Sequence, residues 1–183
     1  MQPFALQILI GPIAALAAST AAGADARSTS LGPVVFYATL VSHSWGYRRQ
    51  GIYVSTDGNV YAFQYGPAEP DWNPAPNAKG QVTASDLQER FSHHPRWLLK
   101  LDEQEMQQRE SSLASFQHFV GPTAPHAPRY DQGTVRLGVY RLDTPSGGYA
   151  DTPLCVNAEP QKEPPLCKWL ESLLQLSNRS GAP

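Results

Sequence analysis

The residues of this chain with the clearest chemistry are its two cysteines, Cys155 and Cys167, in the segment LCVNAEPQKEPPLCKWL. Such a pair can form a disulfide, bind a metal ion or act as a redox couple. A metal site needs further Cys or His residues at ligand spacing, and a redox couple usually has the spacing C-x-x-C. The segment has neither feature. In an oxidising compartment, an even pair this close in the chain is most simply a structural disulfide, which we predict here.

The five histidines do not follow a recognised metal-binding pattern. They are His43, His93, His94, His118 and His126. His93 and His94 are adjacent, so on a regular helix or strand their side chains would diverge rather than hold one ion. The sequence also lacks a Walker loop and the motif G-x-G-x-x-G. We therefore predict neither a metal site nor a bound cofactor.

Ser42 and His43, in the segment SHSWG, place a hydroxyl beside an imidazole base. Neighbouring residues on a strand point to opposite faces, so this pair is a weak candidate for nucleophilic catalysis. The motifs H-E-x-x-H and G-x-S-x-G are absent from the sequence. This absence favours a binding protein over an enzyme. The alternative is a small extracytoplasmic hydrolase or lyase whose catalytic residues come together only in the fold.

Trp72 lies in a proline-rich segment, residues 66–81 (GPAEPDWNPAPNAKGQ), which has no helical or strand periodicity. A loop stiffened by prolines loses little entropy on binding, so Trp72 predicts a contact site for a partner. We assign Tyr65, beside this loop, and Arg129, in the proline-rich segment 120–133, to the same predicted surface. Two other interpretations are open. Trp72 and Tyr65 could stack against a sugar, or Trp72 could pin the loop onto its own domain, and the burial of Trp72 decides.

The N-terminal segment predicts export from the cytoplasm. Residues 4–22 are apolar and rich in alanine, and the following AGADAR contains small-x-small cleavage sites. A membrane anchor is the alternative, but Gly11-Pro12 interrupts the apolar run. We expect a signal peptide over residues 1–26 and a single domain over residues 27–183. The mature protein is then secreted or periplasmic, with no membrane association after cleavage.

Charge and composition restrict the kind of partner. The chain of 183 residues has a formal net charge of −2, and its longest run of basic residues is Arg48-Arg49. Nucleic acid is therefore a poor candidate partner, and a protein or peptide is a better one. The four Trp, eight Tyr and six Phe residues are enough for the core of one domain. The sequence carries no signal of the oligomeric state.

Residues 51–66, GIYVSTDGNVYAFQYG, predict a β-hairpin around Asp57-Gly58. A two-residue turn of the primed type would place Val54 opposite Tyr61. Because side chains alternate along a strand, one set would then face the core. This predicted buried set consists of Ile52, Val54, Tyr61 and Phe63. A β-prone run at residues 34–42 would pair with the hairpin to complete a meander.

The second half of the chain has mainly helical patterns. The expected elements are a short helix from Thr83 or Ser85 to about His94, a strand or helix end at residues 96–101, a helix over residues 103–118 capped by Asp102, a strand over residues 134–142, and a final helix with the stripe Leu166, Trp169, Leu170, Leu173 and Leu174. This order predicts an α+β domain. Its small, mainly antiparallel sheet would consist of the N-terminal meander plus a late strand, with two or three helices on one face.

The same order of segments resembles that of emfourin-type metalloprotease inhibitors. The similar parts are the hairpin around Asp57-Gly58, the Glu- and Gln-rich segment 102–118, the strand 134–142 and the ending PPLCKWLESLL. The resemblance implies a small secreted inhibitor of a protease. The cysteine pair and the loop 66–81 depart from the pattern, so the resemblance assigns no inhibitory residue. A non-catalytic binding module, with a protease inhibitor as one candidate, is the function that we expect.

Overall fold

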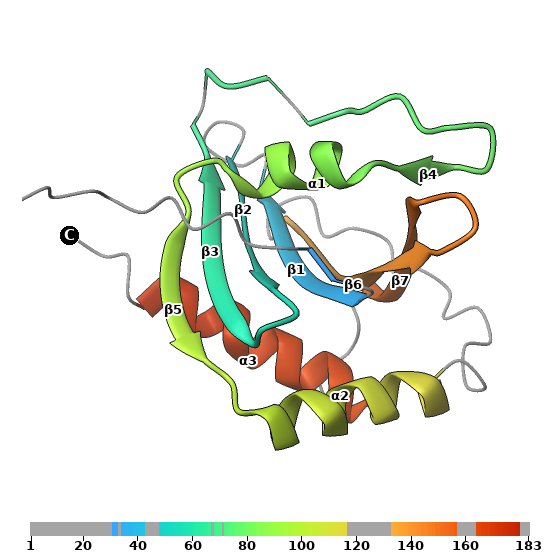
Figure 1. Cartoon of the computed structure of the whole chain (residues 1–183). Helices are drawn as coiled ribbons and strands as arrows, with labels where there is room; N and C mark the ends of the chain where they lie inside the picture. Colours follow the sequence, from blue (N-terminus) through green and yellow to red (C-terminus); the bar gives the residue numbers. More distant parts are fainter. Residues whose placement is uncertain are drawn as a thin grey trace, which may run out of the picture.

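The computed structural model describes residues 31–32, 34–42, 48–66, 68–70, 72–116, 133–156 and 164–179. These residues form one antiparallel sheet of seven strands in the order β4-β7-β6-β1-β2-β3-β5, together with three helices (Figure 1). The strands are β1 (Val34–Ser42), β2 (Arg48–Val54), β3 (Asn59–Tyr65), β4 (Gln81–Val82), β5 (Arg96–Lys100), β6 (Thr134–Asp143) and β7 (Gly148–Val156). The helices are α1 (Ala84–Phe91), α2 (Glu103–Phe116) and α3 (Pro165–Arg179). The predicted α+β class is confirmed.

The sheet is covered on both faces, whereas we expected helices on one. On the first face, α2 and α3 pack on the sheet, and the apolar stripe of α3 contacts residues such as Phe36 and Ile52. Figure 1 shows α3 running across the strands on this side. On the opposite face, Leu87 and Phe91 of α1 pack into an aromatic cluster. The other buried members of this cluster are Val35, Tyr37, Tyr53, Phe63, Tyr65, Tyr140 and Tyr149.

The register of the β2–β3 hairpin differs by one residue from the predicted register. Val54 lies opposite Val60, the Ser55 amide donates to the Asn59 carbonyl, and Gly58 adopts a positive φ of 79°. The turn therefore has three loop residues rather than two, a common alternative for a turn that contains glycine. A shift of one residue moves every second side chain to the other face. The prediction that these four side chains share one face was therefore wrong, although Ile52, Val54 and Phe63 are buried.

In the observed register, Ile52 and Val54 face α3, while Tyr61 and Phe63 lie on the α1 side. Both sets find apolar neighbours because both faces of the sheet are covered. The predicted alternation of side chains along each strand was correct. The prediction of which residues of β2 share a face with which residues of β3 was not.

Strand β7 is a part of the sheet that we did not predict. Its sequence, GYADTPLCV, contains a proline, which cannot donate a ladder hydrogen bond. Pro153 lies opposite Gly138, where the β6–β7 pairing shifts register. Such a bulge tolerates a proline inside a strand. The result is a sheet wider than the predicted meander plus one strand.

The helix ends largely follow the capping signals. Thr83 caps α1 in a capping box with Asp86, and the helix ends at Phe91, three residues before the predicted end. The Asp102 carboxylate accepts a hydrogen bond of 2.7 Å from the Glu105 amide at the start of α2. Residues 96–100, whose sequence is compatible with a strand or a helix end, form the edge strand β5.

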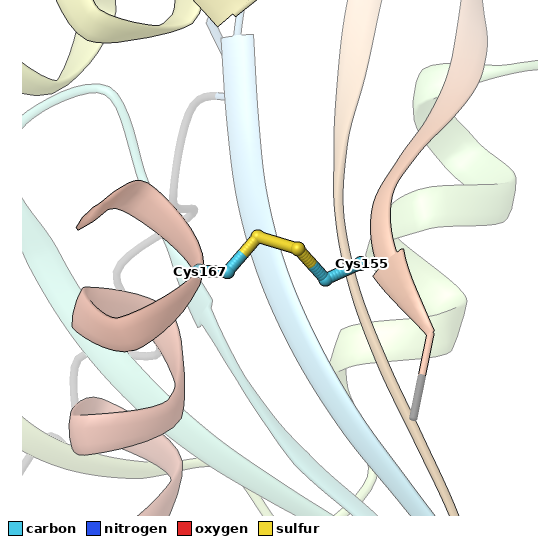
Figure 2. Close-up of a disulfide and its surroundings, with 2 residues drawn as sticks. All are labelled: Cys155 and Cys167. Carbon is cyan, nitrogen blue, oxygen red and sulfur yellow. A yellow bond between two sulfur atoms is a disulfide. The ribbon is translucent and has the colours of Figure 1, made fainter. Parts of the chain in front are cut away.

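The predicted disulfide is present. Cys155, near the end of β7, and Cys167, in the first turn of α3, are joined by an S–S bond of 2.04 Å (Figure 2). The bond ties α3 to the half of the sheet that contains β6 and β7. The predicted signal peptide, residues 1–26, lies outside the described residues. Within the described ranges, no helix is long and apolar enough to span a membrane.

Candidate functional site

A pocket of about 370 Å³ lies on the α1 side of the sheet, and we call it the arginine pocket. Its lining residues come from β1, β2, β6, β7, α1 and the proline-rich loop before β4. They are Thr39, Val41, Arg49, Trp72, Arg90, Thr134, Arg136, Tyr140 and Asp151. On β1 and β6 the lining residues are separated by two or more positions, since strand side chains alternate between faces. The pocket thus depends on the sheet order, which brings β1, β6 and β7 together.

One wall of the pocket is held by a hydrogen-bonded triangle of Tyr37, Arg136 and Asp151. Arg136 donates from Nη2 to Asp151 Oδ2 at 2.7 Å and from Nε to the Tyr37 hydroxyl at 3.1 Å. The Tyr37 hydroxyl donates in turn to Asp151 Oδ1 at 2.7 Å. Burial, reinforced by the charge of Asp151, raises the pKa of Tyr37 far above its usual value. Tyr37 therefore stays protonated and acts as a hydrogen-bond donor to Asp151.

Arg90 occupies the opposite wall and is only 8% exposed. Its guanidinium lies over the Trp72 ring at 4.7 Å and over the Tyr37 ring at 5.0 Å. Its Nη1 donates to the Tyr140 hydroxyl. The buried Nε has no hydrogen-bond partner in the part of the chain that the structure describes. Within the same part, no carboxylate lies at ion-pair distance from Arg90.

Arg109 also lies over a tryptophan ring, but its positive charge is compensated by a carboxylate. Its guanidinium lies over the Trp169 ring at 4.9 Å, but its Nη2 also forms an ion pair with Glu105 at 3.2 Å. The Trp169 indole donates to the same carboxylate at 3.2 Å. A buried charge is costly unless it is paired. Arg90 has the aromatic contact without the carboxylate, which marks it as the unusual arginine of the two.

The sequence patterns predicted no functional role for Arg90, Arg136 or Asp151. The available signal for Arg90 was its position in α1: Leu87, Arg90 and Phe91 are spaced by three and four, so they share the buried face of the helix. An arginine inside an apolar stripe is unusual and could have been singled out. Arg136 and Asp151 have no comparable local signal, because their partners lie on other strands.

Trp72 holds its loop against its own domain, and it also lines the arginine pocket. Its indole donates to the Asp86 carbonyl at 2.8 Å, and its ring packs on the aromatic cluster. Trp72 therefore pins the proline-rich loop to α1. The same ring covers Arg90 and faces the arginine pocket. A role of Trp72 in partner binding stays a prediction.

Tyr65 lies on the far side of Arg90 and is only 2% exposed. Its hydroxyl donates to the Arg90 carbonyl at 3.0 Å, and its ring stacks on His93 with centroids 4.0 Å apart. Tyr65 can therefore support the position of Arg90, but its ring offers no open stacking surface. Arg129, the third predicted contact residue, lies outside the described residues.

The remaining chemical candidates do not form a second site of comparable quality. His93 Nδ1 and His94 Nε2 both lie 3.5 Å from the carboxylate of Glu69, so they converge on one residue despite being adjacent. The positive φ of 46° at His94 accounts for this departure from regular geometry. The described residues contain no group of three or more His, Cys, Asp or Glu side chains that could hold a metal ion. His43, His118 and His126 lie outside the described residues.

A larger hollow, of about 600 Å³, lies beside the end of α3. Its polar side chains include Gln50, Arg96 and Asn178. Gln50 donates to Asn178 at 2.9 Å, and Arg96 donates to the Ser177 carbonyl at 2.9 Å. Because these polar side chains are at least partly exposed to solvent, whereas Arg90 is buried, this hollow gives weaker evidence of a ligand than the arginine pocket does.

Comparison of the chain with known proteins found no matching family model, no matching curated protein and no matching solved structure.

Proposed function

We propose that this protein is a secreted or periplasmic binding module without catalytic activity, and that it binds its partner through the arginine pocket. The observation that carries the proposal is the buried guanidinium of Arg90, which lines a pocket and has no carboxylate partner among the described residues. Trp72, beside it, offers a large aromatic surface. Arginine and tryptophan are the residue types that most often dominate binding energy at interfaces.

The protonation states around the pocket favour binding over catalysis. A general base needs a pKa close to the working pH. Burial raises the pKa of Tyr140 to about 12, although the charge of Arg90 opposes the shift. Tyr37 is shifted further in the same direction, again mainly by burial. Asp151 is engaged by both Arg136 and Tyr37. These groups are suited to holding a ligand by hydrogen bonds rather than to removing a proton from it.

The proposed location rests on the N-terminal segment and on the disulfide. Disulfides persist in oxidising compartments and are rare in reducing ones, so the Cys155–Cys167 bond supports an extracytoplasmic protein. A protein or peptide is the proposed partner. The resemblance in segment order to emfourin-type inhibitors makes a protease one candidate for that partner.

The test is capture of the partner by the secreted protein and by pocket variants. The full chain is expressed with an affinity tag at its C-terminus, purified after export and exposed to the native medium or periplasm, and bound proteins are identified by mass spectrometry. The affinity of the identified partner is then measured by calorimetry. We expect Trp72→Ala and Arg136→Met to weaken binding by about 2 kcal/mol, which is roughly 30-fold in Kd.

The matched control is Trp97→Ala, because Trp97 is 57% exposed on the edge strand β5, away from the pocket lining. Trp72→Phe keeps a ring over Arg90 and separates loss of binding from loss of the loop contact. Equal affinity of the pocket variants and Trp97→Ala would refute the site. Conversion of the partner into a product, seen as a change in its mass on incubation, would favour the hydrolase or lyase alternative.

A further inference from the structure

The arginine pocket contains unused hydrogen-bond donors and no unused carboxylate. Both oxygens of Asp151 are occupied, Oδ1 by Tyr37 and Oδ2 by Arg136. Arg136 uses Nε and Nη2 in these contacts, and Arg90 uses Nη1. An arginine has five N–H donors and no acceptor, so each guanidinium retains donors. A ligand that satisfies this pocket must therefore supply acceptors.

The hydroxyl of Tyr140 adds a hydrogen-bond donor beside Arg90. It accepts the hydrogen bond from Arg90, and its raised pKa of about 12 keeps it protonated at neutral pH. Its own proton has no acceptor among the described residues, in contrast to the proton of Tyr37, which goes to Asp151. Tyr140 and Arg90 thus present adjacent donors from β6 and α1.

The charges that line the pocket favour an anion, because three arginines, Arg49, Arg90 and Arg136, line it beside one carboxylate, Asp151. Asp151 compensates Arg136 through their ion pair of 2.7 Å. Arg90 has no such partner in the described ranges, and its contacts are with aromatic rings and the Tyr140 hydroxyl. A guanidinium stays charged, so a bound anion would stabilise it beyond what these contacts supply.

We propose, on the basis of the binding function above, that the arginine pocket binds an organic carboxylate. The carboxylate accepts hydrogen bonds from Arg90 and Tyr140 and from the free edge of Arg136, and its apolar body lies against Trp72 and Val41. The planar fork of a guanidinium matches the two oxygens of a carboxylate. A pocket of about 370 Å³ holds a small acid or one chain end, not a whole folded surface. A free organic acid and a carboxylate of a peptide partner share this chemistry.

The experiment is calorimetric titration of the exported protein with four aromatic probes of similar shape. They are benzoate, benzamide, benzenesulfonate and phenyl phosphate. We expect benzoate to bind at least about tenfold more tightly than neutral benzamide, because only benzoate carries a charge that pairs with the guanidinium of Arg90. We also expect a downfield shift of the Arg90 Nε–H resonance on addition of benzoate. Tighter binding of benzamide, phenyl phosphate or benzenesulfonate than of benzoate would overturn the carboxylate assignment.

Arg90→Met tests the residue, and Arg109→Met is the matched control because Arg109 also stacks on a tryptophan but has Glu105 as its partner. Arg90→Met should weaken benzoate binding at least about tenfold, and Arg109→Met should leave it unchanged. Arg90→Lys keeps the charge without the fork, so we expect an intermediate affinity even if the methionine variant folds poorly. Benzoate affinity retained in both Arg90 variants would overturn the proposal.

The two sources of carboxylate are distinguished with the peptide Ala-Ala-Phe, carrying either a free or an amidated C-terminus. Preference for the free form supports a peptide chain end as ligand. Binding of benzoate alone supports a small free acid. If a captured partner depends on the pocket but none of the carboxylate probes binds, the ligand class fails and the binding function stands. If benzoate binds but partner capture ignores the pocket variants, the proposed partner site fails instead.

Discussion

At the scale of single residues, the Tyr37 hydroxyl links two charged side chains across three strands. It accepts from Arg136 at 3.1 Å and donates to Asp151 at 2.7 Å. Without this hydroxyl, Arg136 loses an acceptor and Asp151 loses a donor, although both belong to a partly buried ion pair. Such a loss usually costs more than that of a hydrogen bond between neutral groups.

We predict that Tyr37→Phe lowers the free energy of unfolding by about 2–3 kcal/mol. The control is Tyr149→Phe, because within the described residues the Tyr149 hydroxyl has a single hydrogen-bond partner, the Leu31 carbonyl at 3.1 Å. The control should lose about 1 kcal/mol. Urea unfolding followed by circular dichroism measures both values. An equal or smaller loss for Tyr37→Phe would contradict the idea that the triangle is a stabilising unit.

The buried tyrosines also predict how stability depends on alkaline pH. Burial raises the pKa of Tyr65 and of Tyr140 to about 12, above the ordinary value near 10. A raised folded pKa means that the folded state holds the proton more tightly. The resulting stability is complete below about pH 10 and is lost as the pH rises through the folded pKa values.

We therefore expect the free energy of unfolding to fall between about pH 10 and pH 12, with a smaller slope in Tyr140→Phe. Absorbance at 295 nm reports phenolate formation and should show Tyr37, Tyr65 and Tyr140 ionising only as the protein unfolds. Full ionisation of all eight tyrosines while the circular dichroism spectrum is still native would refute this expectation.

At the scale of elements, the hairpin turn is the feature on which side-chain placement depends. Gly58 has a φ of 79°, and a Cβ there would lie 2.7 Å from the Leu101 carbonyl oxygen. Gly147, in the β6–β7 turn, has a φ of 67° but no atom within 4 Å of the same position. The two glycines thus share a left-handed conformation and differ in crowding.

We predict that Gly147→Ala costs about 1 kcal/mol, the strain of a left-handed alanine. Gly58→Ala should cost at least about 1 kcal/mol more, because the added methyl group collides with backbone. Chemical denaturation of the two variants gives the difference directly. Equal costs would mean that the turn relaxes away from Leu101, so that the contact of the added methyl group with Leu101 does not lower the stability.

At the scale of the whole molecule, the disulfide joins the last helix, α3, to strand β7, which lies between β4 and β6 in the sheet (Figure 2). Helix α3 also docks through its own apolar stripe, which contacts β1, β2 and β6. The two kinds of attachment are separable. The bond acts mainly by restricting the unfolded chain, whereas the stripe acts in the folded state.

We expect the double variant Cys155→Ser, Cys167→Ser to fold with α3 in place but to lose about 3 kcal/mol of unfolding free energy. Reductant should lower the stability of the wild-type protein by a similar amount and should not affect the double variant. Thermal and urea unfolding with and without reductant measure both effects. A change of less than about 1 kcal/mol would indicate that the cross-link contributes little beyond the packing of α3.

The features predicted correctly from sequence depend on neighbouring residues in the chain. Asp102 caps α2 through the amide of Glu105, and the stripe Leu166, Trp169, Leu170 and Leu173 buries one side of α3. The cysteine pair and the strand at residues 34–42 belong to the same group. Local spacing and capping chemistry are sufficient for the helices, because their hydrogen bonds close within a few residues. The strand at residues 34–42 was recognisable from its run of β-prone residue types, although its hydrogen bonds go to distant strands.

The features that depended on tertiary structure arise where distant elements meet. An Asp-Gly turn is compatible with two or three loop residues, so the hairpin sequence left open which face Tyr61 and Phe63 would take. The arginine pocket needs β1 between β2 and β6, which places Arg136 and Asp151 beside Tyr37 and opposite Arg90. No local pattern encodes this order, because strand pairing is selected by the packing of both sheet faces together. The residues of the site therefore became recognisable only when the sheet had brought them together.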